Sequence, residues 1–322
     1  MQENATRRAI DAVVDEVSDA VIINHDVLVL VLTGLLARGH VLLEDVPGTG
    51  KTLTARSTAT ALGLSFNRIQ FTPDLLPADV TGTEIYDEHR RQFEFQEGPL
   101  FSNIVLADEI NRASPKTQSA LLEAMEERQV TVAGKTHPLP DPFFVIATQN
   151  SVETGDGTFP LPEAQKDRFI LKTRIGYPSA ADELVLLDRR DERSSRTPTV
   201  GQVLSPADIA TLQGRIEDLH CHQDVKSYIV DIVQATRADE RVRVGVSPRG
   251  SQRLFELARA RALVEGRGFV TPDDVKVNVV PAFGHRILLT TDARINNVTP
   301  ANVLDDILAD VPAPMITHAE QA

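Results

Sequence analysis

The sequence predicts an α/β domain built on a five-stranded parallel sheet, followed by an all-α domain. Three observations lead to this fold class. Short apolar runs alternate with helical stretches in the first half of the chain, the second half shows only helical periodicity, and four helix starts there carry a capping hydroxyl before a proline. Strands separated by helices form parallel βαβ units, whose helices cover both faces of the sheet.

The first half begins with apolar residues at helical spacing, and a more apolar helix is expected around Val27. Five apolar runs then predict strands at 40–44, 66–71, 103–107, 143–148 and 170–175. Helices are predicted near 51–62, 115–127 and 162–169. Two segments alternate around polar tips and predict β-hairpins, at about 79–98 and about 128–140.

The second half changes pattern from about Tyr177. The capping pairs that start its helices are Ser205-Pro206, Ser247-Pro248, Thr271-Pro272 and Thr299-Pro300. Apolar residues at helical spacing follow the first pair, at Ile209, Leu212, Ile216 and Leu219. We therefore expect domains at 1–177 and 178–322, the second a helical bundle.

Composition restricts the function classes. The net charge of −13 argues against a protein that wraps duplex DNA, which usually has a basic face. The N-terminus is charged and has no apolar signal region, and the longest apolar run, 27–36, is too short to span a bilayer. We expect a cytoplasmic protein without membrane insertion.

The stretch "EDVPGTGKT" (44–52) follows a predicted strand and precedes a predicted helix, as a phosphate-binding loop does. Asp45 stands where the general pattern G-x-x-x-x-G-K-[ST] has glycine, and aspartate tolerates a turn there. The groups that touch phosphate and magnesium are backbone N–H groups, a lysine and a hydroxyl, which Gly48, Gly50, Lys51 and Thr52 supply. The loop predicts a nucleotide site.

Two later strand ends complete that prediction. "NIVLADEIN" ends in Asp108-Glu109, one carboxylate to hold magnesium and one to orient the attacking water. Alone, such a pair is equally typical of a solvated strand end. Asn150 ends "FFVIATQN" and could hold the water or the γ-phosphate, or equally cap a turn.

Two arginines are further candidates. Arg168 is expected to end a helix that runs away from the nucleotide loop of its own subunit. Arg249 is expected in the first turn of a helix, where the helix dipole adds positive potential. A lone arginine is more often solvated or paired with a carboxylate.

In this order, the elements resemble an AAA+ ATPase, and the finer match is to the MoxR family. The stretches that carry it are "GHVLLEDVPGTGKT", "IQFTPDLLPADVTG", "VLADEINRASPKTQSALLEAMEERQVTV", "PFFVIATQN" and "PLPEAQKDRF". The resemblance runs from about Val21 to about Leu289, and it covers Asp45, which this family also has. It implies a P-loop αβα sandwich with a helical lid, in which the two hairpins are the helix-2 insert and the pre-sensor-1 hairpin.

The resemblance also implies roles. Lys51 would bind phosphates, Thr52 and Asp108 would hold Mg²⁺, Glu109 would polarise water and Asn150 would be the first sensor. Arg168 would be the finger that enters a neighbour's site, and Arg249 the second sensor, in its own or an adjacent site. Arg112 would face the interface or form a structural salt bridge. The expected ATP-binding residues are Asp45, Val46, Pro47, Gly48, Thr49, Gly50, Lys51, Thr52, Leu53 and Asp108.

Some positions depart from the family pattern. Ser151 replaces a common proline, Lys166 replaces a commonly apolar residue, and the segment 151–160 is slightly expanded. All three lie near the expected subunit interface, so they bear on its geometry more than on nucleotide binding.

The function expected from the resemblance is ATP hydrolysis in a hexameric ring that remodels or activates protein clients. The family's client class implies proteins with a von Willebrand factor A domain. A nucleic-acid motor is disfavoured because the hairpin tips offer only His89, Arg90, Arg91 and Lys135. A chelatase-type motor subunit would differ mainly in its partner, and Glu109 argues against a scaffold that binds nucleotide without hydrolysis.

Overall fold

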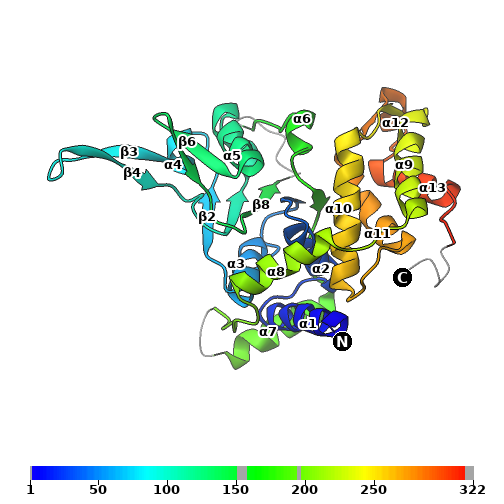
Figure 1. Ribbon diagram of the computed structural model, residues 1–322, viewed down its shortest axis with the longest axis horizontal. Coiled ribbons are helices and arrows are strands. Elements are labelled where there is room, and N and C mark those ends of the chain that lie inside the picture. The colour runs from blue at the N-terminus through cyan, green and yellow to red at the C-terminus, as the bar shows by residue number, and fades with distance from the viewer. Residues whose placement is uncertain (1, 151–157, 194–196, 316–322) are drawn as a thin grey trace.

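The structure, a computed structural model, describes residues 2–150, 158–193 and 197–315 (Figure 1). Its central sheet has the strand order β2-β5-β8-β1-β9, and all neighbours are parallel. The strands are β1 (Val41–Glu44), β2 (Phe66–Gln70), β5 (Ile104–Asp108), β8 (Phe144–Gln149) and β9 (Leu171–Thr173). The five-stranded parallel sheet predicted from the sequence is confirmed.

Helices precede, separate and follow these strands along the chain. They are α1 (Gln2–Ala20), α2 (His25–Leu36), α3 (Lys51–Ala61), α4 (Pro77–Thr81), α5 (Pro115–Glu127), α6 (Glu163–Lys166) and α7 (Ala180–Glu192), with a 3-10 turn η1 (Ile110–Arg112). The helix predicted at 162–169 was wrong in length, since α6 is a single turn. It stops because Phe169 and Ile170 enter the core, where the N–H of Ile170 donates to the carbonyl of His40. Arg168 therefore lies beyond the helix.

Two hairpins project from one side of the sheet (Figure 1). Strands β3 (Gly82–Asp87) and β4 (Gln92–Glu97) form the longer hairpin, and β6 (Gln129–Val132) and β7 (Lys135–Pro138) form the shorter one. The two are connected, because Lys135 forms an ion pair with Glu84 at 3.0 Å and the His137 ring stacks on Phe95 with centroids 3.9 Å apart. One ion pair and one stacked ring pair therefore connect the two hairpins.

The C-terminal region is a helical bundle with one short two-stranded sheet. Its elements are α8 (Pro206–Glu217), α9 (Gln223–Ala238), β10 (Val242–Val244), α10 (Pro248–Val264), α11 (Pro272–Phe283), β11 (Leu288–Leu289), α12 (Thr291–Ile295) and α13 (Pro300–Asp310). All four predicted capping residues are confirmed: Ser205, Ser247, Thr271 and Thr299 each accept a bond from a first-turn N–H ahead of a proline. Local capping chemistry thus sets where these helices begin.

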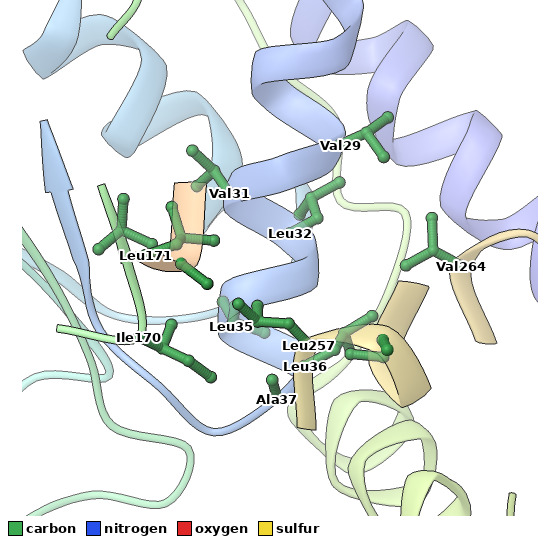
Figure 2. Close-up of a cluster of buried hydrophobic side chains, with 14 of the residues drawn as sticks. Val29, Val31, Leu32, Leu35, Leu36, Ala37, Ile170, Leu171, Leu257 and Val264 are labelled. Carbon is green, nitrogen blue, oxygen red and sulfur yellow. The ribbon is translucent and has the colours of Figure 1, made fainter. Parts of the chain in front are cut away.

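Helix α2 joins the sheet to the bundle (Figure 2). Its side chains, Leu32 and Leu36 among them, are buried between Ile170 and Leu171 on one side and Leu257 and Val264 on the other. Each fully buried leucine stabilises the fold by about 1.5–3 kcal/mol. Because one apolar cluster contains residues from both regions, the sheet and helix α10 of the bundle are held in a fixed relation.

Candidate active site

The carboxyl ends of β1, β2, β5 and β8 meet at one edge of the sheet, where open α/β sheets bind their ligands. The loop from β1 to α3 turns there through Gly48 and Gly50, whose φ angles of 84° and 82° favour glycine. Gly50 is the N-cap of α3, so the first N–H groups of that helix are free to bind an anion. The pocket around the loop is lined by Asp45, Pro47, Gly48, Thr49, Gly50, Lys51, Thr52, Leu53, Arg68, Gln70, Asp108, Glu109, Thr148 and Asn150.

Asp45 does more than tolerate the turn. Its carboxylate is buried and accepts the N–H of Val46 at 2.9 Å, and of Ile175 and Gly176 at 2.8 and 3.0 Å. Ile175 and Gly176 follow β9, so this side chain ties the start of the loop to the segment leaving the last strand. Hydrogen bonds to an ionised carboxylate are stronger than neutral ones. Asp45 therefore fixes the position of the loop.

Lys51 begins α3 and points back across the loop, where its Nζ donates to the carbonyl of Val46 at 2.6 Å. Of the predicted ATP-binding stretch, every residue lines the pocket except Val46, whose backbone carbonyl makes this contact. The lysine ammonium and the free N–H groups of α3 together provide the positive potential that a triphosphate requires.

Asp108 ends β5 with both carboxylate oxygens engaged. The hydroxyl of Thr148 donates to Oδ1 at 2.6 Å, and the guanidinium of Arg68 donates to Oδ2 at 2.6 Å. Thr52 lines the same pocket, so one hydroxyl and one carboxylate are available as oxygen ligands. This set fits Mg²⁺, which usually binds one or two carboxylates together with waters and substrate phosphates. Arg68 would have to release Oδ2 to make room.

Glu109 follows directly and has a backbone φ of 57°, a strained value for a residue other than glycine. Its N–H donates to the Thr148 hydroxyl at 2.8 Å. Its Oε2 accepts bonds from Gln70 at 2.8 Å and from Arg112 at 3.0 Å. Strain of this kind persists only where surrounding contacts hold it. In this subunit Arg112 forms a salt bridge with Glu109. Asn150 is buried at the end of β8 and lines the pocket.

The two candidate arginines are not at this pocket. Arg168 lies just before β9 and donates from Nε to Oε2 of Glu126 at 2.8 Å. Arg249, in the first turn of α10, donates to Oε1 of the same carboxylate at 2.8 Å. They line a separate cavity of about 290 Å³ that also contains Gly39 and His40, which precede β1. The four residues of β1 alone span about 13 Å, so neither arginine can reach the Lys51 loop of its own chain.

Comparison with known proteins identifies the family. The model of the "ATPase family associated with various cellular activities (AAA)" matches residues 40–171, and an AAA lid domain matches residues 234–307. The chain is 48% identical to YeaC of Bacillus subtilis over 94% of both chains. It is 44% identical to the chaperone MoxR1 of Mycobacterium tuberculosis over 94% of this chain and 81% of the relative. The chain belongs to the MoxR family of AAA ATPases.

This family membership implies nucleotide binding and agrees with the fold. The solved structure of a candidate ATPase from Cytophaga hutchinsonii superimposes with a TM-score of 0.89 at 38% identity, over 97% of each chain. Among the described residues, no helix is both long and apolar enough to cross a bilayer.

A hollow beside the loop was not foreseen from the sequence. Ile22, Ile23, Ile175 and Tyr177 line it together with the N-terminal end of α2. It adjoins the loop, because Asp45 binds the backbone of Ile175 and a Cβ on Gly50 would lie 3.8 Å from Val21.

Sequence reasoning also missed Arg68 and Gln70, which point into the pocket from β2. Their spacing of two places both on one face of that strand, a signal that could have been read in "NRIQF". Glu126 gave no signal in the sequence. The departure at Ser151 and most of the expanded segment lie outside the described residues, while Lys166 forms an ion pair with Glu163 at 3.0 Å.

Proposed function

We propose that this MoxR-family protein hydrolyses ATP in a ring of identical subunits, with each site shared by two of them. One subunit provides the phosphate cradle: Lys51, with Thr52 and Asp108 for Mg²⁺, Glu109 for the attacking water and Asn150 as first sensor. Bound Mg²⁺ neutralises the charge that develops on the phosphates. The adjacent subunit provides Arg168 as the finger and Arg249 as the second sensor.

The observation that carries this proposal is the separation of the two sets of residues. The cradle lies at the carboxyl end of the sheet, whereas Arg168 and Arg249 lie together at the amino end, bound to Glu126. A finger supplied by a neighbour contributes about 10³–10⁵ in rate in phosphoryl-transfer systems. Two arginines that cannot reach their own nucleotide can serve one in a second copy, and a ring, such as the expected hexamer, satisfies this at every interface.

Glu109 has to leave Gln70 and Arg112 before it can orient a water molecule. Both donors occupy Oε2, so that oxygen cannot accept a hydrogen bond from a water molecule without giving one of them up. The pocket as described therefore corresponds to an inactive arrangement, and closure by the neighbouring subunit would release Glu109.

A complementation assay tests the shared site. Lys51→Ala removes the cradle and leaves the arginines, whereas Arg168→Ala removes the finger and leaves the cradle. Each variant alone should release little phosphate from ATP, and an equal mixture should recover a substantial part of wild-type activity. If the mixture is no more active than the separate variants, the shared site is excluded. Phosphate release by wild-type protein at saturating ATP also distinguishes hydrolysis from a scaffold that only binds nucleotide.

For the client, we propose proteins that carry a von Willebrand factor A domain, on which the ring acts as a chaperone. The hairpins β3–β4 and β6–β7 are the candidate contact surfaces. Tyr86 and Phe93 are exposed on β3–β4, with ring centroids 5.3 Å apart, so the hairpin carries an aromatic pair although its tip does not. Capture of such a client by Glu109→Gln rings in ATP tests this, and loss of capture with Tyr86→Ala would place the contact. If a Glu109→Gln ring loaded with ATP retains no protein of this class, the client assignment is wrong.

A further inference from the structure

Glu126 occupies an unusual position between the two candidate trans arginines. It lies in the last turn of α5, in the sheet region, and is 35% exposed. Each of its oxygens accepts one bond, Oε2 from Arg168 and Oε1 from Arg249, both at 2.8 Å. Burial acts to raise the pKa of Glu126, but the bonds and charges of the two arginines outweigh it and lower the pKa. The carboxylate is therefore charged and holds both guanidiniums.

The surroundings of this carboxylate favour anions. The cavity is lined by six arginines, Arg38, Arg128, Arg168, Arg249, Arg253 and Arg259, and by three glutamates, Glu126, Glu217 and Glu256. Glu217 and Glu256 are paired with Arg259 and Arg253. Arg128 donates to the carbonyls of Phe143 and Arg38 and forms no ion pair with the described residues. Burial, and after it the charge of Arg38, lowers the pKa of Arg128. The arginines lining the cavity outnumber the glutamates, so positive charge is in excess here.

The segment that carries Arg168 is also attached to the bundle. Asp167 forms an ion pair with the buried Arg286 at 2.6 Å, and Arg249 approaches Asp167 at 3.9 Å. Arg168 and Arg249 thus belong to one group of residues, and this group contacts α5 through the hydrogen bonds of both arginines to Glu126. Just after Glu126, α5 ends at Glu127, and its C-cap Arg128 leads directly into the β6–β7 hairpin.

We propose that Glu126 is an internal competitor for the triphosphate of the adjacent subunit. In a free subunit its carboxylate takes the place of the γ-phosphate and keeps Arg168 and Arg249 side by side. When a neighbour presents ATP, the phosphate oxygens replace Glu126 as partner of the two guanidiniums. Release of Glu126 then frees the end of α5 and the hairpin that follows it. This inference rests on the proposed shared site. It adds that Glu126 keeps Arg168 and Arg249 from binding a phosphate until a neighbouring subunit presents ATP.

Competition makes a specific prediction for Glu126→Gln, which keeps the shape of the side chain and removes its charge. Arginines no longer held by a carboxylate bind the neighbour's nucleotide more tightly. Two partly exposed ion pairs are lost, so the concentration of arginine donor that gives half-maximal activity should fall about threefold to tenfold.

The experiment uses an acceptor and a donor. The acceptor is Arg168→Ala at fixed concentration, and the donor is Lys51→Ala, titrated with and without Glu126→Gln. Phosphate release is measured against donor concentration. The matched control is Glu127→Gln in the donor, which makes the same charge change one residue away, at a side chain without an ion pair to the described residues. The control should leave the half-saturating concentration unchanged.

Three results are informative. A lower half-saturating concentration with Glu126→Gln, and not with Glu127→Gln, supports the competitor. An unchanged or higher one overturns it, and a lower plateau without that shift shows that Glu126 only positions Arg168. Glu126→Ala must shift the curve in the same direction, and circular dichroism verifies that each donor is folded. If the Lys51→Ala donor activates no acceptor at all, the shared site itself fails, which is a separate outcome.

Discussion

The two ends of the central sheet have opposite chemistry. The carboxyl end offers a lysine, free N–H groups of α3 and two carboxylates, Asp108 and Glu109. The amino end offers a cluster of arginines around Glu126. The first is suited to hold a triphosphate and its metal, the second to neutralise charge that develops on it. This difference is what the proposed shared site requires, in which one copy would supply half of each of two sites.

The largest effect is expected from Arg168→Ala, at the amino end. Loss of a trans-acting guanidinium should reduce the turnover number about 10³-fold or more, with little change in nucleotide binding to the same subunit. Steady-state phosphate release and nucleotide titration measure the two quantities. Arg243→Ala, at an exposed arginine of β10 without an ion pair to the described residues, is the control. Weaker nucleotide binding by Arg168→Ala subunits would show that Arg168 contributes to the site of its own subunit, and would contradict the separation of the two ends.

At the carboxyl end, Asp45→Gly restores the general loop pattern but should be harmful here. It leaves the N–H groups of Ile175 and Gly176 without their acceptor. Loss of a hydrogen bond to a charged group costs about 1.5–3 kcal/mol, so the loss of these two should lower the free energy of unfolding by about 3–6 kcal/mol. Asp45→Asn, which keeps an oxygen acceptor, should cost less. Urea denaturation measures both, and equal stability of the wild type and Asp45→Gly would show that Asp45 is only tolerated.

The pH dependence of stability sharpens the comparison, because each of two buried histidines lies near arginines or lysines. Burial, with the charge of Arg128, lowers the pKa of His40 to about 3, and burial with Arg286 lowers the pKa of His285 well below its ordinary value. Both stay neutral in the fold and protonate in the unfolded chain below about pH 6.5. Stability is therefore complete above that pH and decreases as the pH falls.

Between pH 6.5 and pH 5 the loss should be about 2 kcal/mol for each histidine. Urea denaturation across this range measures it, and NMR of labelled histidine should show both rings neutral at pH 5. A ring that protonates near pH 6.5 in the folded protein would contradict its assigned burial.

The smallest expected effect concerns the cap of α10. The Ser247 hydroxyl accepts the N–H of Gly250 at 3.3 Å and sets the first turn, which carries Arg249. Ser247→Ala should cost about 1 kcal/mol of stability and reduce the ability of a subunit to activate an Arg168→Ala acceptor. Ser205→Ala, at the cap of α8, should cost a similar amount without that loss. If both variants activate equally well, the geometry at Arg249 does not depend on its cap.

The fold could be predicted from the sequence where local chemistry determines it. Apolar runs predicted the strands and capping hydroxyls predicted the helix starts, because each of these signals lies within a few residues of the element it determines. The contacts of the site are different in kind. Asp45 meets Ile175 and Glu126 meets Arg249 across more than 100 residues, and nothing in their own segments marks the partner. The ion pair of Arg68 with Asp108 depends on β2 lying beside β5, which strand prediction alone does not fix.

The most direct test of the shared site is the specific ATPase activity of the wild-type protein as a function of its concentration, with the assembly state followed by light scattering. The account predicts low activity per subunit where the protein is monomeric, and a rise that parallels the formation of the ring. Full activity per subunit in a solution that contains only monomers would contradict it, since a monomer places both arginines at the wrong end of its sheet.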